Sequence, residues 1–122
     1  MELHDLGFLK AIKIKDDLAE FIVNDGVEFD LPMVDVYHNW ITTHLTAPCL
    51  VLVNKMNAYT YTFEAQRIIG TLPAIKAVAF VVYNRVSEIT TNNLAAMPRD
   101  IAWNKKIFDN REEAIAWLES QR

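Results

Sequence analysis

Cys49-Leu-Val-Leu-Val53 and Ala77-Val-Ala-Phe-Val-Val-Tyr83 are two uninterrupted apolar runs, and they decide the fold that this sequence predicts. Strands that are covered on both faces have this composition, and such strands are usually parallel and central in their sheet. Between the two runs, residues 62–72 carry an apolar stripe at helical spacing, and Gly70 and Pro73 mark its end. A strand, a helix and a second strand at this spacing predict a right-handed crossover.

Upstream of these runs, the sequence predicts antiparallel strands. Residues 12–15 alternate apolar and charged side chains with period two, and residues 18–23 form a second run after a turn at Asp16-Asp17. The segment Asn24-Asp25-Gly26 predicts a further turn, since Asp-Gly tolerates a positive φ. We expect residues 27–30 to extend this meander.

Four helices are expected, of which one is the crossover helix. Another opens at Leu31-Pro32 with Asp30 as its cap. Its expected inward face comprises Met33, Val36, Tyr37, Trp40, Ile41 and His44. Residues 86–97 predict the next helix, with Ile89, Leu94 and Met97 inward. A short strand at residues 103–108 and a capping-box variant, Asn110-Arg-Glu-Glu113, lead into the last helix. The fold class is therefore α/β, with one domain over residues 1–122.

Composition and charge limit the class of protein. A chain of 122 residues with 52% apolar residues suits one globular domain. No apolar run reaches the roughly 18 residues that span a bilayer, and Cys49 is the only cysteine. We expect no secretory signal, because residues 1–5 lack a basic segment followed by an apolar one. The formal charge of −4 argues against nucleic acid, which needs clustered Lys and Arg. We expect a cytoplasmic protein without a membrane span.

The usual catalytic motifs are missing from the sequence. None of the three glycines belongs to a phosphate-binding loop, and there is no Gly-x-Ser-x-Gly segment. His44 and Cys49 could form an imidazole–thiolate pair, but a small buried cysteine is the preferred interpretation. Asp35 and His38 could share a metal ion, but a solvated helix face is preferred. We therefore expect neither an enzyme nor a cofactor or metal.

Met56-Asn-Ala-Tyr-Thr-Tyr-Thr-Phe63 is the most unusual segment, because it joins a central strand to a helix and is rich in hydroxyls and rings. Ligands in open α/β sheets favour the carboxyl ends of strands. The candidate binding residues are Asn57, Tyr59, Thr60, Tyr61 and Thr62, with Arg85 from the loop after the next strand. The alternative is a capped turn, with the tyrosines packed on the domain or on a second subunit and Thr60 or Thr62 serving only as a helix cap.

The order of the elements resembles that of a known superfamily. Ala47-Pro-Cys-Leu-Val-Leu-Val-Asn54, Ile75-Lys-Ala-Val-Ala-Phe-Val-Val82 and Ile107-Phe-Asp-Asn-Arg-Glu-Glu-Ala-Ile-Ala-Trp-Leu118 carry the resemblance. The chain resembles the STAS superfamily, named for sulfate transporters and anti-sigma-factor antagonists. It is most similar to the small stand-alone bacterial STAS/SEC14-like proteins. The resemblance covers nearly the whole chain and implies a mixed sheet with antiparallel strands first and parallel strands after.

One departure from that superfamily concerns its regulatory motif. The antagonists carry Asp-Ser-x-Gly at the start of the helix after the third core strand, and a kinase phosphorylates that serine. The matching stretch here is Tyr61-Thr-Phe-Glu64, without the aspartate and the glycine and with threonine in place of serine. Thr62 is therefore the candidate for phosphorylation, and the usual phosphoserine switch is not expected.

The resemblance implies two possible functions. The first is a non-catalytic regulatory module that binds a protein partner, with self-association as a homodimer as a further expectation. The second is a carrier of a small apolar ligand or lipid of the SEC14-like type. That carrier needs a cavity lined by residues such as Met33, Trp40, Phe63 and Phe80.

Overall fold

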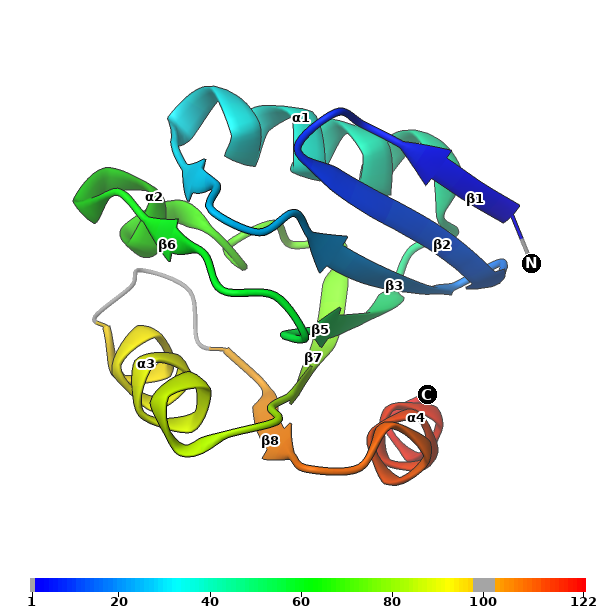
Figure 1. The fold of residues 1–122 in the computed structure, drawn as a ribbon. Helices are drawn as coiled ribbons and strands as arrows, with labels where there is room; N and C mark the ends of the chain where they lie inside the picture. Colours follow the sequence, from blue (N-terminus) through cyan, green and yellow to red (C-terminus); the bar gives the residue numbers. More distant parts are fainter. Residues whose placement is uncertain (1, 98–102) are drawn as a thin grey trace.

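A six-stranded mixed sheet forms the centre of the computed structural model, which describes residues 2–97 and 103–122 (Figure 1). The strand order is β1-β2-β3-β5-β7-β8. The first three strands pair antiparallel with one another: β1 (Glu2–Asp5), β2 (Leu9–Lys15) and β3 (Leu18–Val23). The other three continue parallel to β3: β5 (Cys49–Asn54), β7 (Ile75–Val81) and β8 (Lys105–Phe108). The expected α/β fold with a mixed sheet is confirmed.

The helices cover both faces of this sheet. They are α1 (Leu31–His44), α2 (Phe63–Ile68), α3 (Arg85–Ala96) and α4 (Arg111–Ser120). The first three contribute buried side chains to one core cluster, whereas α4 contributes to a separate cluster on the opposite face. Figure 1 shows α4 on the side of the sheet away from α1. Both apolar runs, in β5 and β7, are therefore covered on both faces, as their composition predicts.

Residues 27–30 do not extend the meander, and that expectation is wrong. β4 (Glu28–Phe29) instead pairs in parallel with β6 (Thr60–Tyr61) in a separate two-stranded sheet. The physical reason is that β3 already pairs with β2 on one edge and with β5 on the other, so no edge is left. Phe29 then becomes buried in the core, 1% exposed, with its ring centroid 6.2 Å from that of Tyr37.

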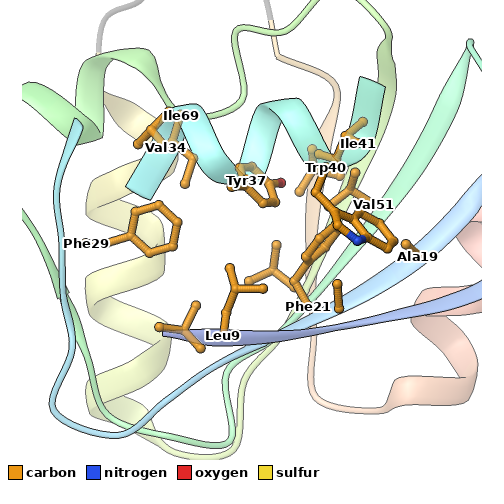
Figure 2. Close-up of a cluster of buried hydrophobic side chains, with 14 of the residues drawn as sticks. Leu9, Ala19, Phe21, Phe29, Val34, Tyr37, Trp40, Ile41, Val51 and Ile69 are labelled. Atoms are coloured by element: carbon orange, nitrogen blue, oxygen red, sulfur yellow. The ribbon is translucent and has the colours of Figure 1, made fainter. Parts of the chain in front are cut away.

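Helix α1 begins as expected, but its buried face is shifted. The Asp30 side chain accepts a hydrogen bond from the amide of Met33 at 3.0 Å, which caps the helix. The buried residues of α1 are Val34, Tyr37, Trp40 and Ile41, and Figure 2 shows them beside Leu9, Phe21 and Phe29. Val36, which was expected to face inward, is 44% exposed, because the stripe continues from Tyr37 back to Val34 three residues earlier.

The helices α2 and α3 differ from expectation in length and in orientation. Helix α2 ends at Ile68, before residue 72, and Gly70 follows with φ +81°, a conformation that L side chains rarely adopt. In α3, Thr91 and Leu94 are buried, while Ile89 is 49% exposed and does not face inward as expected. Helix α3 packs near the end of the sheet at β8, so only a narrow stripe of it is covered.

Helix α4 is held at both ends by polar contacts. Asn110 caps it by accepting a hydrogen bond from the amide of Glu113 at 3.0 Å, as the capping-box variant predicts. At its start, Arg111 pairs with the buried carboxylate of Glu20 on β3. At the C-terminus, Arg122 pairs with Asp17 at 2.8 Å. The helix is therefore fastened to β3 and to the turn that precedes it.

Within residues 2–97 and 103–122, no helix combines the length and the apolar character needed to cross a bilayer.

Candidate binding cleft at the carboxyl end of the parallel strands

A cleft of about 670 Å³ lies where β5 and β7 end. Three segments line it: the turn at residues 25–27, residues 55–60, which run from the end of β5 to the start of β6, and the start of α3 with Asn84, Val86, Ser87 and Thr90. Parallel strands direct their following loops to the same edge of the sheet, which is why these segments meet. The sequence predicts a ligand site at this end of the parallel strands, and the cleft lies there.

One wall of the cleft is held together by hydrogen bonds between two turns. The Asn57 side chain donates to the carbonyl of Val23 at 3.0 Å, and the Ala58 amide donates to the Asp25 carboxylate at 3.1 Å. In return, the Gly26 amide donates to the carbonyl of Ala58 at 2.7 Å. These three bonds fasten the segment after β5 to the turn after β3.

The other wall is the N-terminus of α3. The Asn84 side chain caps this helix by accepting a hydrogen bond from the Ser87 amide at 2.8 Å. The first amides of a helix have no acceptor within the helix. The amides of Arg85 and Val86 also have no hydrogen-bond acceptor elsewhere in the described chain. Together with the helix dipole, this wall presents a partial positive charge.

Lys55 is the unexpected residue of this site. It lines the cleft and is only 8% exposed. Its Nζ lies 4.7, 4.9 and 5.7 Å from the ring centroids of Tyr59, Tyr61 and Phe80. No hydrogen bond or ion pair joins this ammonium to any residue in the part of the chain that the structure describes. Burying an ammonium costs several kcal/mol, and a cation–π contact returns roughly 0.5 to 2 kcal/mol.

Two tyrosines form the aromatic cage around Lys55. The hydroxyls of Tyr59 and Tyr61 are 3.0 Å apart, and their rings meet edge to face at 5.3 Å. Burial is the largest cause of a Tyr59 pKa well above the ordinary value, and the neighbouring Tyr61 adds to it. The Tyr59 phenol therefore stays neutral and supplies no anion to Lys55.

Thr62 serves as the N-cap of α2. Its Oγ1 accepts a hydrogen bond from the amide of Ala65 at 3.2 Å. The helix-cap alternative that the sequence allowed therefore applies to Thr62, while Thr60 is exposed and lines the cleft. Thr62 is half-buried, so its hydroxyl is only partly accessible to a kinase.

The other candidate residues divide into those that line the cleft and those that do not. Asn57, Tyr59 and Thr60 line it, whereas Tyr61 lies behind it against Lys55. Arg85 is exposed at the first position of α3 and does not line the cleft. Sequence reasoning missed Lys55, and the one available signal was its position directly after the buried strand β5.

Exposed apolar side chains surround the cleft. Met56 and Val86 line it and are 53% and 72% exposed. Ile89, three residues after Val86 on the same side of α3, is 49% exposed. We call these three residues the apolar rim. They come from two walls that hydrogen bonds hold in place, so the rim is a preformed surface.

The residues expected to line an apolar carrier cavity do not meet in one. Trp40 and Phe80 are buried in the core, Met33 is half-buried, and Phe63 is 63% exposed. A small pocket beside Phe80 and Tyr61 has a volume of about 10 Å³. That is room for about one water molecule and too little for a lipid chain.

The sequence also offered an imidazole–thiolate pair and a metal site, and the structure shows where their side chains lie. The Cys49 thiol donates to the carbonyl of Ala74 at 3.3 Å, and burial raises its pKa to about 11. His44 stacks on Trp40, with its Nδ1 3.0 Å from the Trp40 carbonyl oxygen. Burial lowers the pKa of His38. The described residues contain no group of three or more His, Cys, Asp or Glu side chains that could hold a metal ion.

Comparison with known proteins gives one match. A family model described as Domain of unknown function (DUF7793) matches residues 12–122. No curated protein and no solved structure matches the chain.

Proposed function

This chain belongs to the family described as Domain of unknown function (DUF7793), and we propose that it is a non-catalytic regulatory module that binds a protein partner at the cleft. The observation that carries this proposal is the apolar rim of Met56, Val86 and Ile89. Exposed apolar groups that gather on a preformed surface are typical of protein-interaction sites. Desolvating these three side chains would supply the driving force for docking.

The chemistry of the cleft supports binding rather than catalysis. Asn57 and Asp25 are occupied in holding the wall, and the Tyr59 phenol is held neutral. The one thiol, Cys49, is buried and protonated, and it opens β5 at the end away from the cleft. A free thiol fits a reducing compartment, and we propose the cytoplasm as the setting.

The proposed module resembles anti-sigma-factor antagonists without relying on the usual phosphoserine switch. The resemblance matches Thr62 to that serine, but the Thr62 hydroxyl oxygen caps α2. Regulation in this proposal therefore acts through occupancy of the cleft and its rim. Self-association as a homodimer remains part of the proposal, with the rim as the surface that would be shared.

Two matched variants test this proposal. Ile89→Asp places a charge on the rim outside the cleft lining, and Val36→Asp does the same on α1, where Val36 is 44% exposed. The measurement is affinity capture from lysate and light scattering of each purified variant. We expect the wild type and Val36→Asp to bind the same partner or copy, and Ile89→Asp to lose it. Equal binding by all three would show that the rim is not the interface.

A further inference from the structure

We propose that the cleft binds a small organic molecule that carries one anionic group, a carboxylate or a phosphate monoester. The anionic group would lie between Lys55 and the start of α3. This inference goes beyond the proposed function, because it assigns the floor of the cleft a ligand whether or not a protein docks on the rim. Its test uses purified protein alone, so it can fail independently of the partner experiment.

Two buried charged side chains, those of Glu20 and Lys55, differ in their partners. Glu20 is 2% exposed and accepts hydrogen bonds from both Arg111 and Asn54. Lys55 is 8% exposed, and among the described residues its ammonium contacts aromatic rings but makes no hydrogen bond or ion pair. Buried charges in proteins are normally paired. The unpaired one lines a cleft, which is where a ligand can supply the missing anion.

Helix α3 is oriented with its N-terminus at the cleft. This helix has 12 residues, and its N-terminus forms the wall of the cleft in which Val86 and Ser87 lie. The free amides of Arg85 and Val86 and the helix dipole favour an anion at this place. Lys55 lines the cleft directly after the end of β5, so the two positive groups come from separate elements.

The size and the lining of the cleft indicate what the rest of the ligand is like. Its volume of about 670 Å³ is within the range of about 300 to 1,000 Å³ for small-molecule sites. Met56, Val27 and Val86 supply apolar surface for an organic body. Asp25 also lines the cleft and disfavours a second anionic group. The ligand class is therefore a molecule with one anionic group and an apolar body.

NMR titration of the isotope-labelled full chain tests this inference, with benzoate and phenyl phosphate as probes. Benzamide and inorganic phosphate are the matched controls, since the first lacks the charge and the second lacks the organic body. We expect at least one anionic probe to shift the amides of residues 55–60 and 85–87 in a saturable way. Each control compound should bind at least about tenfold more weakly than the anionic probe.

Three variants complete the test. Lys55→Met keeps an unbranched side chain on the rings and should weaken probe binding about tenfold or more, whereas Lys55→Arg keeps the charge and should bind within about fivefold. Lys106→Met is the control, because Lys106 also lies over a ring, 5.4 Å from Phe108, outside the cleft. It should bind like the wild type.

The inference is overturned if neither anionic probe shifts residues 55–60 and 85–87, or if the controls bind as tightly as the probes. Undiminished binding by a folded Lys55→Met chain would also overturn it. If that variant does not fold, the location of the wild-type shifts and the affinity of Lys55→Arg decide the question. Wild-type shifts confined to other parts of the chain would count against the site. Loss of probe binding in both Lys55→Arg and the control Lys106→Met would also count against it, because the loss would then not depend on the position of the charge.

Discussion

Arg111 at the start of α4 binds the carboxylate of Glu20 on β3 through two of its guanidinium nitrogens. Its Nη2 donates to Glu20 Oε1 at 2.7 Å, and its Nε lies 3.1 and 3.2 Å from the two carboxylate oxygens. Asn54 donates to the same carboxylate at 2.8 Å. The hydrogen bond to Glu20 is the largest cause of the raised pKa of Arg111. This pair connects α4 to the middle of the sheet.

Arg111→Met should destabilise the fold strongly, because it leaves the buried carboxylate of Glu20 without its cation. We expect a loss of about 3 kcal/mol in the free energy of unfolding, the lower end for a broken buried pair, since Arg111 is partly exposed. Urea unfolding measures it. Arg67→Met, on the exposed surface of α2, is the control and should change stability by less than about 0.5 kcal/mol. Equal stabilities of the two variants would refute the structural role of the pair.

Asp17 and Arg122 should make stability depend on acidic pH. The hydrogen bond from Arg122 lowers the pKa of Asp17 below its ordinary value of 3.8. A carboxyl with a lowered folded-state pKa contributes stability above the unfolded pKa and loses it as pH falls through the folded value. The free energy of unfolding of the wild type should therefore fall as pH drops below 3.8.

Arg122→Gln should remove part of this acid dependence, which urea unfolding at several pH values measures. Asp16→Asn is the neighbouring control, because the Asp16 side chain is 93% exposed and should leave the wild-type dependence in place. If Arg122→Gln keeps the full dependence, the pair does not set the pKa of Asp17.

Thr62 should matter to stability as a helix cap. Thr62→Ala removes the acceptor for the Ala65 amide, and we expect a loss of about 1 kcal/mol. Thr62→Ser and Thr62→Asp keep an oxygen acceptor and should stay within about 0.5 kcal/mol of the wild type. Thermal and urea unfolding compare them. A stable Thr62→Ala chain would mean that the cap contributes little here.

Cys49 should be unreactive in the folded chain. With a thiol pKa of about 11, only about one molecule in a thousand carries the thiolate at about pH 8, and the residue is buried. Ellman's reagent should modify the unfolded chain promptly and the native chain only at the rate of unfolding. Prompt reaction of the native protein would mean that the start of β5 is accessible.

The central strands and the helix caps could be predicted because their signals are local. The runs at residues 49–53 and 77–83 have a composition that suits strands covered on both faces. Asp30 and Asn110 act on amides three residues away, so the caps depend on short stretches of sequence. These elements are the ones that position the cleft.

The pairing of β4 with β6 could not be predicted, because it joins Glu28 to Thr60 across the chain. The same holds for helix orientation: Val36 and Ile89 are apolar, yet the sheet covers other residues of α1 and α3. Lys55 was missed for a related reason. Lysine is almost never buried, and its burial here depends on rings that come from β6 and β7 as well as from its own loop.

The central claim is that the cleft and its rim form the binding surface, and hydrogen–deuterium exchange of the chain with and without its captured partner tests this most directly. The account predicts slower exchange at residues 55–60 and 84–90 in the complex, with α1 unchanged. Protection confined to α1, to β1 or to the exposed side of α4 would contradict it, because the partner would then bind a surface other than the cleft.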